Sequence, residues 1–357
     1  MRTLSPFCFG RNATGKVSQL TMHHDGVDAV NTRLDAAPPA CQGAVLAVLA
    51  CALVNMAAHA TAAQPGAIPG TPFERHVIDD GSGRQVTYYL SRPKAASAPL
   101  MLMIQGSGCV PVLTERQGAA SSTLFNMMPF GQDGRFAVLV VEKPFAAEAQ
   151  PCSARFHQDF TAESWLLALQ SSVRAARKAA WVSPGRMLAF GHSEGAVMAT
   201  MLAAADERVT DVVALGGSGT TQLYDFIVHA YRTCFNAPAC LADVEHKARA
   251  IALEPDSATR FAWGHPYKRW SSFFRVDPGA ALLRSRARVY IGFGTADQAV
   301  PALSQEIMVA KLLAAGRDVT VRRVPDADHS FGQPGMAGYA GLDREYRAAL
   351  DWFWLGK

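Results

Sequence analysis

Residues 186–199 read RMLAFGHSEGAVMA, and this stretch decides the fold. The apolar run 187–190 is typical of a buried parallel strand, and the Ala-rich residues after Gly195 are typical of a helix. A G-x-S-x-G pentapeptide between a strand and a helix predicts a nucleophile elbow, a turn so tight that Gly191 and Gly195 must be glycine. We therefore expect Ser193 to present its hydroxyl at the carboxyl edge of a sheet as a catalytic nucleophile.

The composition is that of an ordinary globular protein with little excess charge. The chain has 357 residues, of which 49% are hydrophobic, and a formal net charge of +4 at pH 7. This length allows one large domain or two small ones with a full core. Lys and Arg form no runs and do not alternate with aromatic residues, so the sequence indicates no nucleic-acid partner.

The first sixty-three residues differ from the rest of the chain. Residues 1–42 show no hydrophobic period, so we expect them to be unstructured, or an extension from a start codon assigned too early. Residues 43–63 contain an apolar core that is typical of a signal peptide and too short to span a bilayer. This predicts an exported protein, periplasmic or secreted, with no stable membrane span in the mature chain. A buried or anchoring helix is the alternative, and a lipoprotein is less favoured because apolar residues continue past Cys51.

Cysteine usage agrees with export. Removal of residues 1–63 would leave four cysteines, an even number that suits two disulfides in an oxidising compartment. Cys234 and Cys240 are close in the sequence and are the favoured pair, which leaves Cys109 with Cys152. No cysteine or histidine spacing indicates a zinc or other metal site.

From residue 73 to residue 357, apolar strand-like runs alternate with helix-like segments. That alternation predicts an α/β domain with a mostly parallel sheet covered by helices on both faces. An opening hairpin covers 73–78 and 86–90, and the further strands are expected at 100–104, 136–141, 187–190, 209–215, 287–293 and 319–324. Helices are expected at 162–181, after Gly195, at 302–315 and at 342–354.

Residues 220–286 interrupt this alternation with a long, mostly helical and aromatic-rich segment. An insertion after a strand of an α/β sheet is usually a cap over the active edge, so we expect a helical cap. Its aromatic residues are candidates for the substrate pocket, with the cap's own core as the alternative. The candidates are Trp263, Tyr267, Trp270 and Phe274.

Two further loops carry residues that suit a catalytic triad. GTADQAVP at 294–301 follows one expected strand and contains Asp297, and PDADHSF at 325–331 follows the last and contains His329. Both loops lie at carboxyl ends of strands, where an open parallel sheet forms its crevice. Asp326 and Asp328 are alternative acids, and Asp297 could instead cap the following helix. The side chains of His192 and Glu194 are expected only to line the entrance.

With GHSEG, GTADQAVP and DADHSF in this order, residues 73–357 resemble the α/β-hydrolase superfamily. The resemblance implies an α/β-hydrolase fold with a triad of Ser193, Asp297 and His329. It also implies that the loop after the expected strand 100–104 supplies an oxyanion donor. The expected donors are the backbone N–H of Glu194 and that of Ser107 or Gly106.

This reading predicts a serine hydrolase that cleaves a carboxylic ester through an acyl-serine intermediate. His329 would remove the serine proton, and Asp297 would hold the imidazole tautomer. The expected substrate is a small-molecule ester or a short peptide, and no metal or organic cofactor is implied. Alternatives on the same fold are a serine peptidase of prolyl-oligopeptidase or aminopeptidase type and an acyltransferase. A non-catalytic binding protein on a hydrolase scaffold is the alternative outside the enzymes.

Overall fold

The structure, a computed structural model, describes residues 7–11, 17–24, 27–32, 66–116, 119–146, 153–233, 238–336 and 338–356. The chain divides into two units, Met1–Thr61 and Ala62–Lys357. The predicted signal peptide at 43–63 lies outside the described residues, so it stays a prediction.

The first unit contains a three-stranded antiparallel sheet in the order β1-β2-β3. This differs from the expectation that residues 1–42 lack regular structure. His24 pairs with Val27, which leaves Asp25-Gly26 between the two paired residues. Asp-Gly between two β-forming runs is a strong hairpin signal, and it does not depend on a hydrophobic period. The strands are β1 (Phe7–Arg11), β2 (Val17–His24) and β3 (Val27–Thr32).

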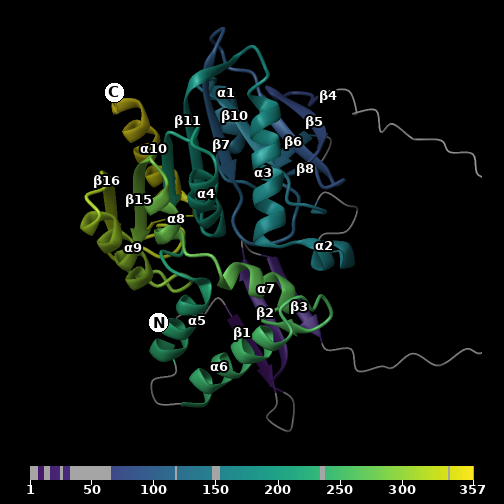
Figure 1. Cartoon of the computed structure of the whole chain (residues 1–357), viewed down its shortest axis with the longest axis vertical. Coiled ribbons are helices and arrows are strands. Elements are labelled where there is room, and N and C mark those ends of the chain that lie inside the picture. The colour runs from purple at the N-terminus through teal and green to yellow at the C-terminus, as the bar shows by residue number, and fades with distance from the viewer. Residues whose placement is uncertain are drawn as a thin grey trace, which may run out of the picture. The chain divides into compact units, whose positions relative to one another are not determined.

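The second unit is built on a nine-stranded sheet in the order β16-β15-β12-β11-β7-β10-β6-β5-β4 (Figure 1). The strands from β16 to β10 are parallel to their neighbours, and β6, β5 and β4 add antiparallel strands at one edge. The mostly parallel sheet is as the sequence predicted. Its strands are β4 (Gly66–Ala67), β5 (Phe73–Asp79), β6 (Gln85–Ser91), β7 (Ala98–Ile104), β10 (Ala137–Val141), β11 (Val182–His192), β12 (Asp211–Leu215), β15 (Arg288–Gly294) and β16 (Val319–Val324).

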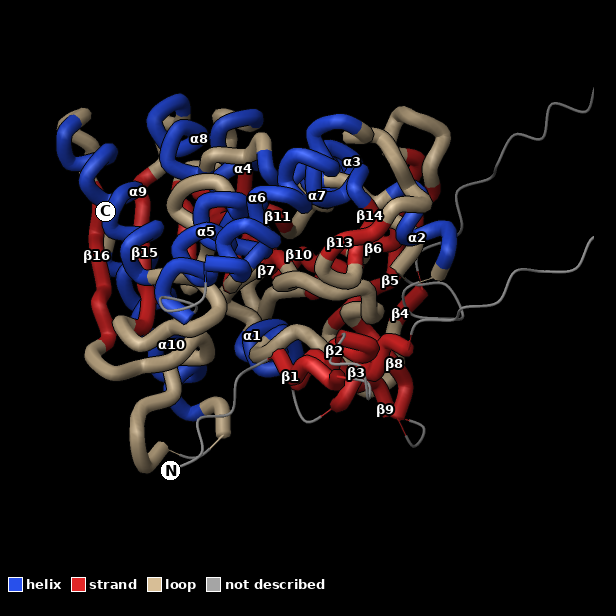
Figure 2. Tube along the Cα trace, turned by 90° about the horizontal axis from the view of Figure 1, so that it is seen from below, coloured by secondary structure: helices blue, strands red, loops and turns tan. Residues whose placement is uncertain are grey.

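Helices cover both faces of this sheet, and the strand side chains divide between them. Along β7, Leu100 and Leu102 belong to one apolar cluster, whereas Met101 and Met103 belong to the other. This period of two with apolar residues on both sides explains why the strands read as continuous apolar runs. Figure 2 shows the two helical layers on opposite sides of the strands. One layer holds α3 (Ala162–Ala176), α4 (Glu194–Ala205), α8 (Pro278–Arg284) and α9 (Ala302–Ala314), and the other holds α1 (Met127–Asp133) and α10 (Ala340–Leu355).

The helix expected at 162–181 is shorter, because α3 ends at Ala176. Beyond it, the N–H groups of Lys178 and Ala179 donate to carbonyls only three residues back. This tighter turn brings the Trp181 carbonyl to the N–H of Ala98 in β7, so the chain joins the sheet there. Short elements that the sequence did not predict are β8 (Leu113–Arg116), β9 (Ala119–Ser122), α1 and α2 (Ala154–Asp159).

The insertion at 220–286 contains most of the expected cap and one helix that belongs elsewhere. Its cap elements are α5 (Gln222–Thr233), α6 (Pro238–Leu253), the short β13 (Phe261–Ala262) and β14 (His265–Pro266), and α7 (Tyr267–Phe274). The following α8 contacts α4 and α9 in the layer on the sheet. Of the residues predicted as a cap, α8 therefore packs with the helices on the sheet, and the cap role of 220–286 stays a prediction.

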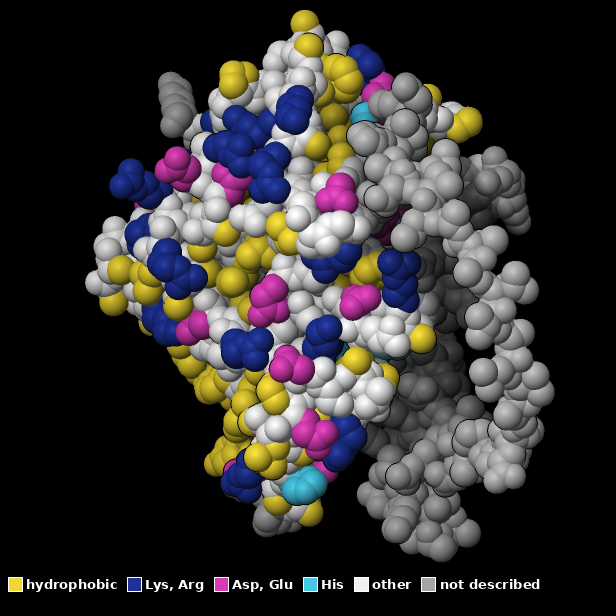
Figure 3. All heavy atoms as spheres, turned by 45° about the vertical axis from the view of Figure 1, so that its right-hand side comes forward, with side chains coloured by type: hydrophobic (Ala, Val, Ile, Leu, Met, Phe, Trp, Pro, Cys, Tyr) yellow, Lys and Arg dark blue, Asp and Glu magenta, His cyan; other side chains and the backbone are white. Residues whose placement is uncertain are grey.

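Basic and acidic side chains both occur across the face shown in Figure 3, with apolar side chains between them. None of the helices in the described part of the chain is both long and apolar enough to cross a membrane.

Candidate active site

The turn between β11 and α4 forces Ser193 into a conformation that non-glycine residues rarely adopt. Its φ is 59° and its ψ is −129°. A Cβ added at Gly191 would lie 2.1 Å from the Gly195 carbonyl oxygen, and one added at Gly195 would lie 2.2 Å from that of Ile104. Both positions must therefore be glycine, as the sequence predicted. Strained backbone of this kind is concentrated at functional sites, where it is part of how a side chain is presented.

The structure brings together the three residues that the sequence singled out. His329 Nε2 lies 3.0 Å from Ser193 Oγ, and His329 Nδ1 lies 2.8 Å from Asp297 Oδ2. The three residues follow the carboxyl ends of β11, β15 and β16. These strands belong to the run of parallel neighbours β16-β15-β12-β11 in the sheet. A serine hydroxyl, an imidazole and a carboxylate are thus joined in one hydrogen-bonded chain.

Asp297 hydrogen-bonds to the imidazole, and in the described residues neither Asp326 nor Asp328 does. Asp297 is 1% exposed, and its second oxygen accepts hydrogen bonds from the N–H groups of Ala299 and Val300 at 2.8 and 2.9 Å. These bonds fix the carboxylate within its own loop. The capping alternative is wrong, because the N-cap of α9 is Pro301 and this helix has no side-chain cap hydrogen bond. Asp328 instead accepts from backbone N–H groups of its own loop.

The charged form of His329 is favoured in this site. Burial of the ring disfavours the positive charge, but the charge and hydrogen bond of Asp297, helped by the charge of Asp328, outweigh it. The net result raises the pKa of His329 above its usual value. An imidazole with a raised pKa is a stronger base toward the serine proton.

The expected oxyanion donors lie beside Ser193. Glu194 is the first residue of α4, where a backbone N–H has no acceptor within its helix. On the other side, a Cβ added at Gly106 would lie 3.4 Å from Ser193 Cβ. In the described part of the chain, the N–H of Ser107 donates no hydrogen bond. These groups are therefore available, and their role toward an oxyanion stays a prediction.

Solved structures are similar to this chain in fold, whereas no protein-family model and no curated protein sequence matches it. An acylaminoacyl peptidase from Pyrococcus horikoshii has a TM-score of 0.54 and 12% identity, covering 79% of this chain and 41% of that one. A puromycin-hydrolyzing peptidase from Mycobacterium tuberculosis has a TM-score of 0.52 and 14% identity, covering 78% and 38%. Est1E from Butyrivibrio proteoclasticus with bound ferulic acid has a TM-score of 0.50 and 16% identity, covering 78% and 97%.

The chain has the α/β-hydrolase fold. It spans about two fifths of the length of the two peptidases and nearly the full length of Est1E. At these identities the similarity establishes the fold, and function is argued from the site itself.

Within this α/β-hydrolase fold, a buried charged cluster that the sequence did not reveal surrounds Glu194. Glu194 is 4% exposed, so its side chain does not line an entrance as expected. Arg269 of α7 forms an ion pair and hydrogen bond with it, and Lys143 Nζ lies 4.0 Å from Glu194 Oε1. Glu194, the residue after Ser193, thus lies beside one cation from α7 and one from the loop after β10. Nothing local in the sequence signals that these distant charges meet.

His192 also has a contact beyond lining the entrance. Its Nε2 donates a hydrogen bond to the backbone carbonyl oxygen of His329 at 2.9 Å. The two ring centroids are 4.8 Å apart. The residue before Ser193 therefore holds the loop that carries the His329 imidazole.

The four cap aromatics form a cluster of their own. Tyr267 and Trp270 are each 6% exposed, and Trp263 stacks on Phe226 of α5 with centroids 4.6 Å apart. Trp263 also meets Trp270 edge to face, and Phe274 packs against the same cluster. Of the two alternatives, the contacts support the cap core. Contact of the partly buried Trp263 and Phe274 with substrate stays a prediction.

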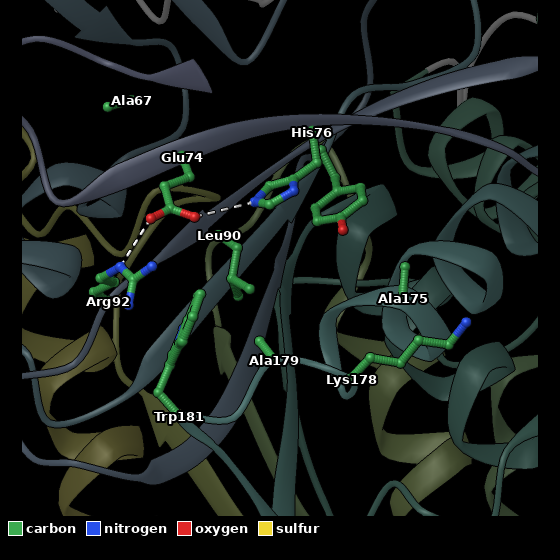
Figure 4. Close-up of a pocket in the computed structure, with 10 residues that line it drawn as sticks. Ala67, Glu74, His76, Leu90, Arg92, Ala175, Lys178, Ala179 and Trp181 are labelled. Carbon is green, nitrogen blue, oxygen red and sulfur yellow. Dashed lines mark hydrogen bonds and ion pairs between the residues drawn. The ribbon is translucent and has the colours of Figure 1, made fainter. Parts of the chain in front are cut away.

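One hollow in the structure lies apart from Ser193, Asp297 and His329. A hollow of about 640 Å³ is lined by β5, β6 and the end of α3, where Glu74 lies between His76 and Arg92 (Figure 4). No triad residue lines it.

Cys152 and Cys234 lie outside the described residues, so neither predicted disulfide pair is tested. In the described residues, no group of three or more His, Cys, Asp or Glu side chains could hold a metal ion.

Proposed function

We propose that this chain is a serine hydrolase that cleaves a carboxylic ester through an acyl-serine intermediate. The observation that carries the proposal is the hydrogen-bonded chain from Ser193 through His329 to Asp297, presented by a strained elbow. Triads are recognised by geometry and roles, and these distances lie within the range of productive hydrogen bonds.

Acylation follows from the geometry. Ser193 Oγ attacks the ester carbonyl carbon while its proton passes to His329 Nε2, and the carbonyl π electrons move to the oxygen as an oxyanion. The oxyanion then re-forms the carbonyl, the bond to the alkoxy oxygen breaks, and His329 returns the proton to the departing alcohol. Asp297 keeps Nδ1 protonated and stabilises the imidazolium between the two transfers.

Deacylation repeats these steps with water. His329 removes a proton from water, the resulting nucleophile attacks the acyl carbon, and Ser193 leaves with the proton from His329. The N–H of Glu194 and that of Ser107 or Gly106 would stabilise the oxyanion in both halves, with each donor contributing roughly 3–4 kcal/mol.

The charge balance beside Ser193 supports an ester over a peptide with a free amino terminus. An aminopeptidase needs a free carboxylate near the nucleophile to bind the substrate ammonium group. Glu194, the acidic neighbour of Ser193, is already buried and paired with Arg269. A peptidase is the second candidate, since the peptidase structures are also similar in fold.

Labelling with a fluorophosphonate tests whether Ser193 is the nucleophile. Hydrolysis rates for esters and for anilides test which kind of bond the enzyme cleaves. Wild type should react with the probe, and Ser193→Ala should not. Hydrolysis of p-nitrophenyl esters should exceed that of aminoacyl- and prolyl-anilides under the same conditions. Equal labelling of Ser193→Ala would overturn the mechanism, and faster anilide cleavage would establish the peptidase. We also propose that the protein is exported, on the apolar segment at 43–63.

A further inference from the structure

We infer that Lys143 is a positioning residue that aims the Ser107 N–H at the oxyanion by holding two carbonyls of the loop after β7. The inference rests on the proposed function, because an oxyanion forms only if Ser193 attacks a carbonyl. Lys143 lies just after β10, the neighbour of β7 in the sheet. Its side chain is fully buried.

The Lys143 ammonium donates to two carbonyl oxygens of the loop after β7. Its Nζ lies 2.5 Å from the Gly106 carbonyl oxygen and 2.7 Å from that of Gly108. Gly108 has a φ of 110°, a conformation that favours glycine and turns the chain so that both carbonyls reach one cation. Charge-assisted bonds of this kind are stronger than neutral ones.

Because the peptide bond is planar, holding the Gly106 carbonyl also fixes the direction of the Ser107 N–H. The structure contains no cis peptide bond in the described residues, so the C=O of Gly106 and the N–H of Ser107 point in opposite directions. Because the Gly106 oxygen faces Lys143, the Ser107 N–H faces away from it. That N–H donates no hydrogen bond in the described part of the chain, and Gly106 lies beside Ser193. This favours Ser107 over Gly106 as the second donor.

The residue before Lys143 holds the other end of the same loop. The Glu142 carboxylate accepts from the N–H of Val112 at 2.8 Å, and it also accepts from the Tyr89 hydroxyl at 3.1 Å. Two adjacent residues of opposite charge thus hold the loop, one through its carbonyls and one through an N–H. A loop held at both ends suits an oxyanion donor, which must be oriented before the reaction starts.

The acidic groups around Lys143 favour its protonated, charged form although the side chain is buried. Burial, together with the charge of Arg269, lowers the pKa of Lys143 to about 8, while the charges of Glu194 and Glu142 oppose this. The ammonium also lies 4.6 Å from the centroid of the Trp165 ring. The side chain is therefore mostly charged at neutral pH, and its donors are directed at the two loop carbonyls.

The test compares Lys143→Met, which keeps the length but removes the donors, with Asp211→Asn as a matched control. Asp211 is equally buried and charged, but it pairs with Arg186 and Arg288 at the amino end of β12, away from Ser193. The readouts are kcat and KM for p-nitrophenyl acetate, and the affinity for a trifluoromethyl ketone that forms an oxyanion with Ser193.

Lys143→Met should lower kcat by about 10²–10³-fold with little change in KM, and it should weaken the ketone by a similar factor. Asp211→Asn should lower the melting temperature but leave kcat and ketone affinity within about threefold of wild type, since it removes no donor. A folded Lys143→Met enzyme with wild-type kcat and ketone affinity would overturn the inference.

Ser107→Pro keeps the inference testable if Lys143→Met does not fold. It removes the N–H itself from an exposed loop residue, so it should cost the same 10²–10³-fold in kcat. Lys143→Gln keeps an N–H donor, so its kcat should fall less than that of Lys143→Met. In the double variant, Lys143→Gln should add nothing to Ser107→Pro. A wild-type kcat in Ser107→Pro would overturn the inference.

Ser193→Ala, measured in parallel, separates this inference from the proposed function. If Ser193→Ala keeps the wild-type rate, the proposed serine mechanism is wrong. If Ser193→Ala abolishes hydrolysis while Lys143→Met and Ser107→Pro keep it, only the role of Lys143 is wrong.

Discussion

The imidazole of His192 donates a hydrogen bond to the backbone carbonyl oxygen of His329 at 2.9 Å. His192 immediately precedes Ser193, so one elbow residue holds the loop of the proposed base while the next carries the proposed nucleophile. This contact couples the two groups between which the proton must pass. A shift of the His329 loop would lengthen the 3.0 Å distance to Ser193 Oγ.

Replacing His192 by Phe should lower kcat about five- to tenfold. The substitution keeps a ring of similar size but removes one hydrogen bond, which contributes about 1 kcal/mol. KM should change little, because the loop acts on the reacting groups. Steady-state kinetics on p-nitrophenyl acetate check this, with a melting curve to confirm folding. An unchanged kcat would mean that the hydrogen bond is dispensable for positioning.

Asp297→Asn should lower kcat by about 10⁴-fold, because an amide cannot hold the imidazole in the required tautomer. Asp328→Asn is the matched control, since Asp328 bonds to its own loop rather than to the ring nitrogens. It should retain most activity at the pH optimum. If Asp328→Asn were the crippling change, Asp297 would not be the catalytic acid partner.

The Asp328→Asn variant should also shift the pH profile in a defined direction. His329 must be neutral to accept the serine proton, so kcat/KM should rise as pH increases through its pKa. Asp328 contributes to the raised pKa of His329, so Asp328→Asn should move this rise to lower pH. A profile of kcat/KM from pH 5 to 9 checks the direction.

Arg269→Gln should destabilise the protein and lower kcat, because it leaves the Glu194 carboxylate buried beside the proposed oxyanion site. Breaking a buried ion pair costs about 3–5 kcal/mol, and both side chains are nearly fully buried. The double variant Glu194→Gln with Arg269→Gln removes both charges and should regain much of the stability. Denaturant unfolding and kcat of wild type, Arg269→Gln and the double variant test this. Failure of the double variant to recover either quantity would refute the charge argument.

Trp263→Ala should change the ranking of ester chain lengths if the cap contacts the acyl group. Trp263 is only partly buried, whereas Trp270 is 6% exposed within the cap core. Trp263→Ala should therefore slow long p-nitrophenyl esters more than the acetate, and Trp270→Phe should mainly lower the melting temperature. Equal loss on all esters would show that Trp263 is structural as well.

Mature protein recovered from the cell envelope should begin near residue 63 and contain no free thiol. The prediction follows from the apolar segment at 43–63 and from the four cysteines that remain after it. Amino-terminal sequencing and thiol titration without reductant are the measurements. An exported protein that retains residues before Arg33 would contradict the signal peptide, and four titratable thiols would contradict the disulfides.

The sequence by itself determined the elbow and the order of the triad. Gly191 and Gly195 had to be glycine for a local reason, since the turn leaves no room for a Cβ, and such a requirement can be read from five consecutive residues. Asp297 and His329 could be placed because each follows an apolar strand, and parallel strands bring their carboxyl ends to one edge. These features depend on spacing along the chain.

Only the tertiary structure decided which distant side chains meet around the elbow and the strand ends. His192 and His329 are separated by 137 positions, and Arg269 and Glu194 by 75, so no periodicity links them. The same holds for Lys143, whose position after an apolar strand does not reveal that its ammonium lies under the loop at Gly106. The cap aromatics were ambiguous for a related reason: helical spacing shows that one face is buried, but the partner depends on how α5, α6 and α7 pack together. Burial and charge pairing arise from proximity in the folded chain, and that is where these contacts were decided.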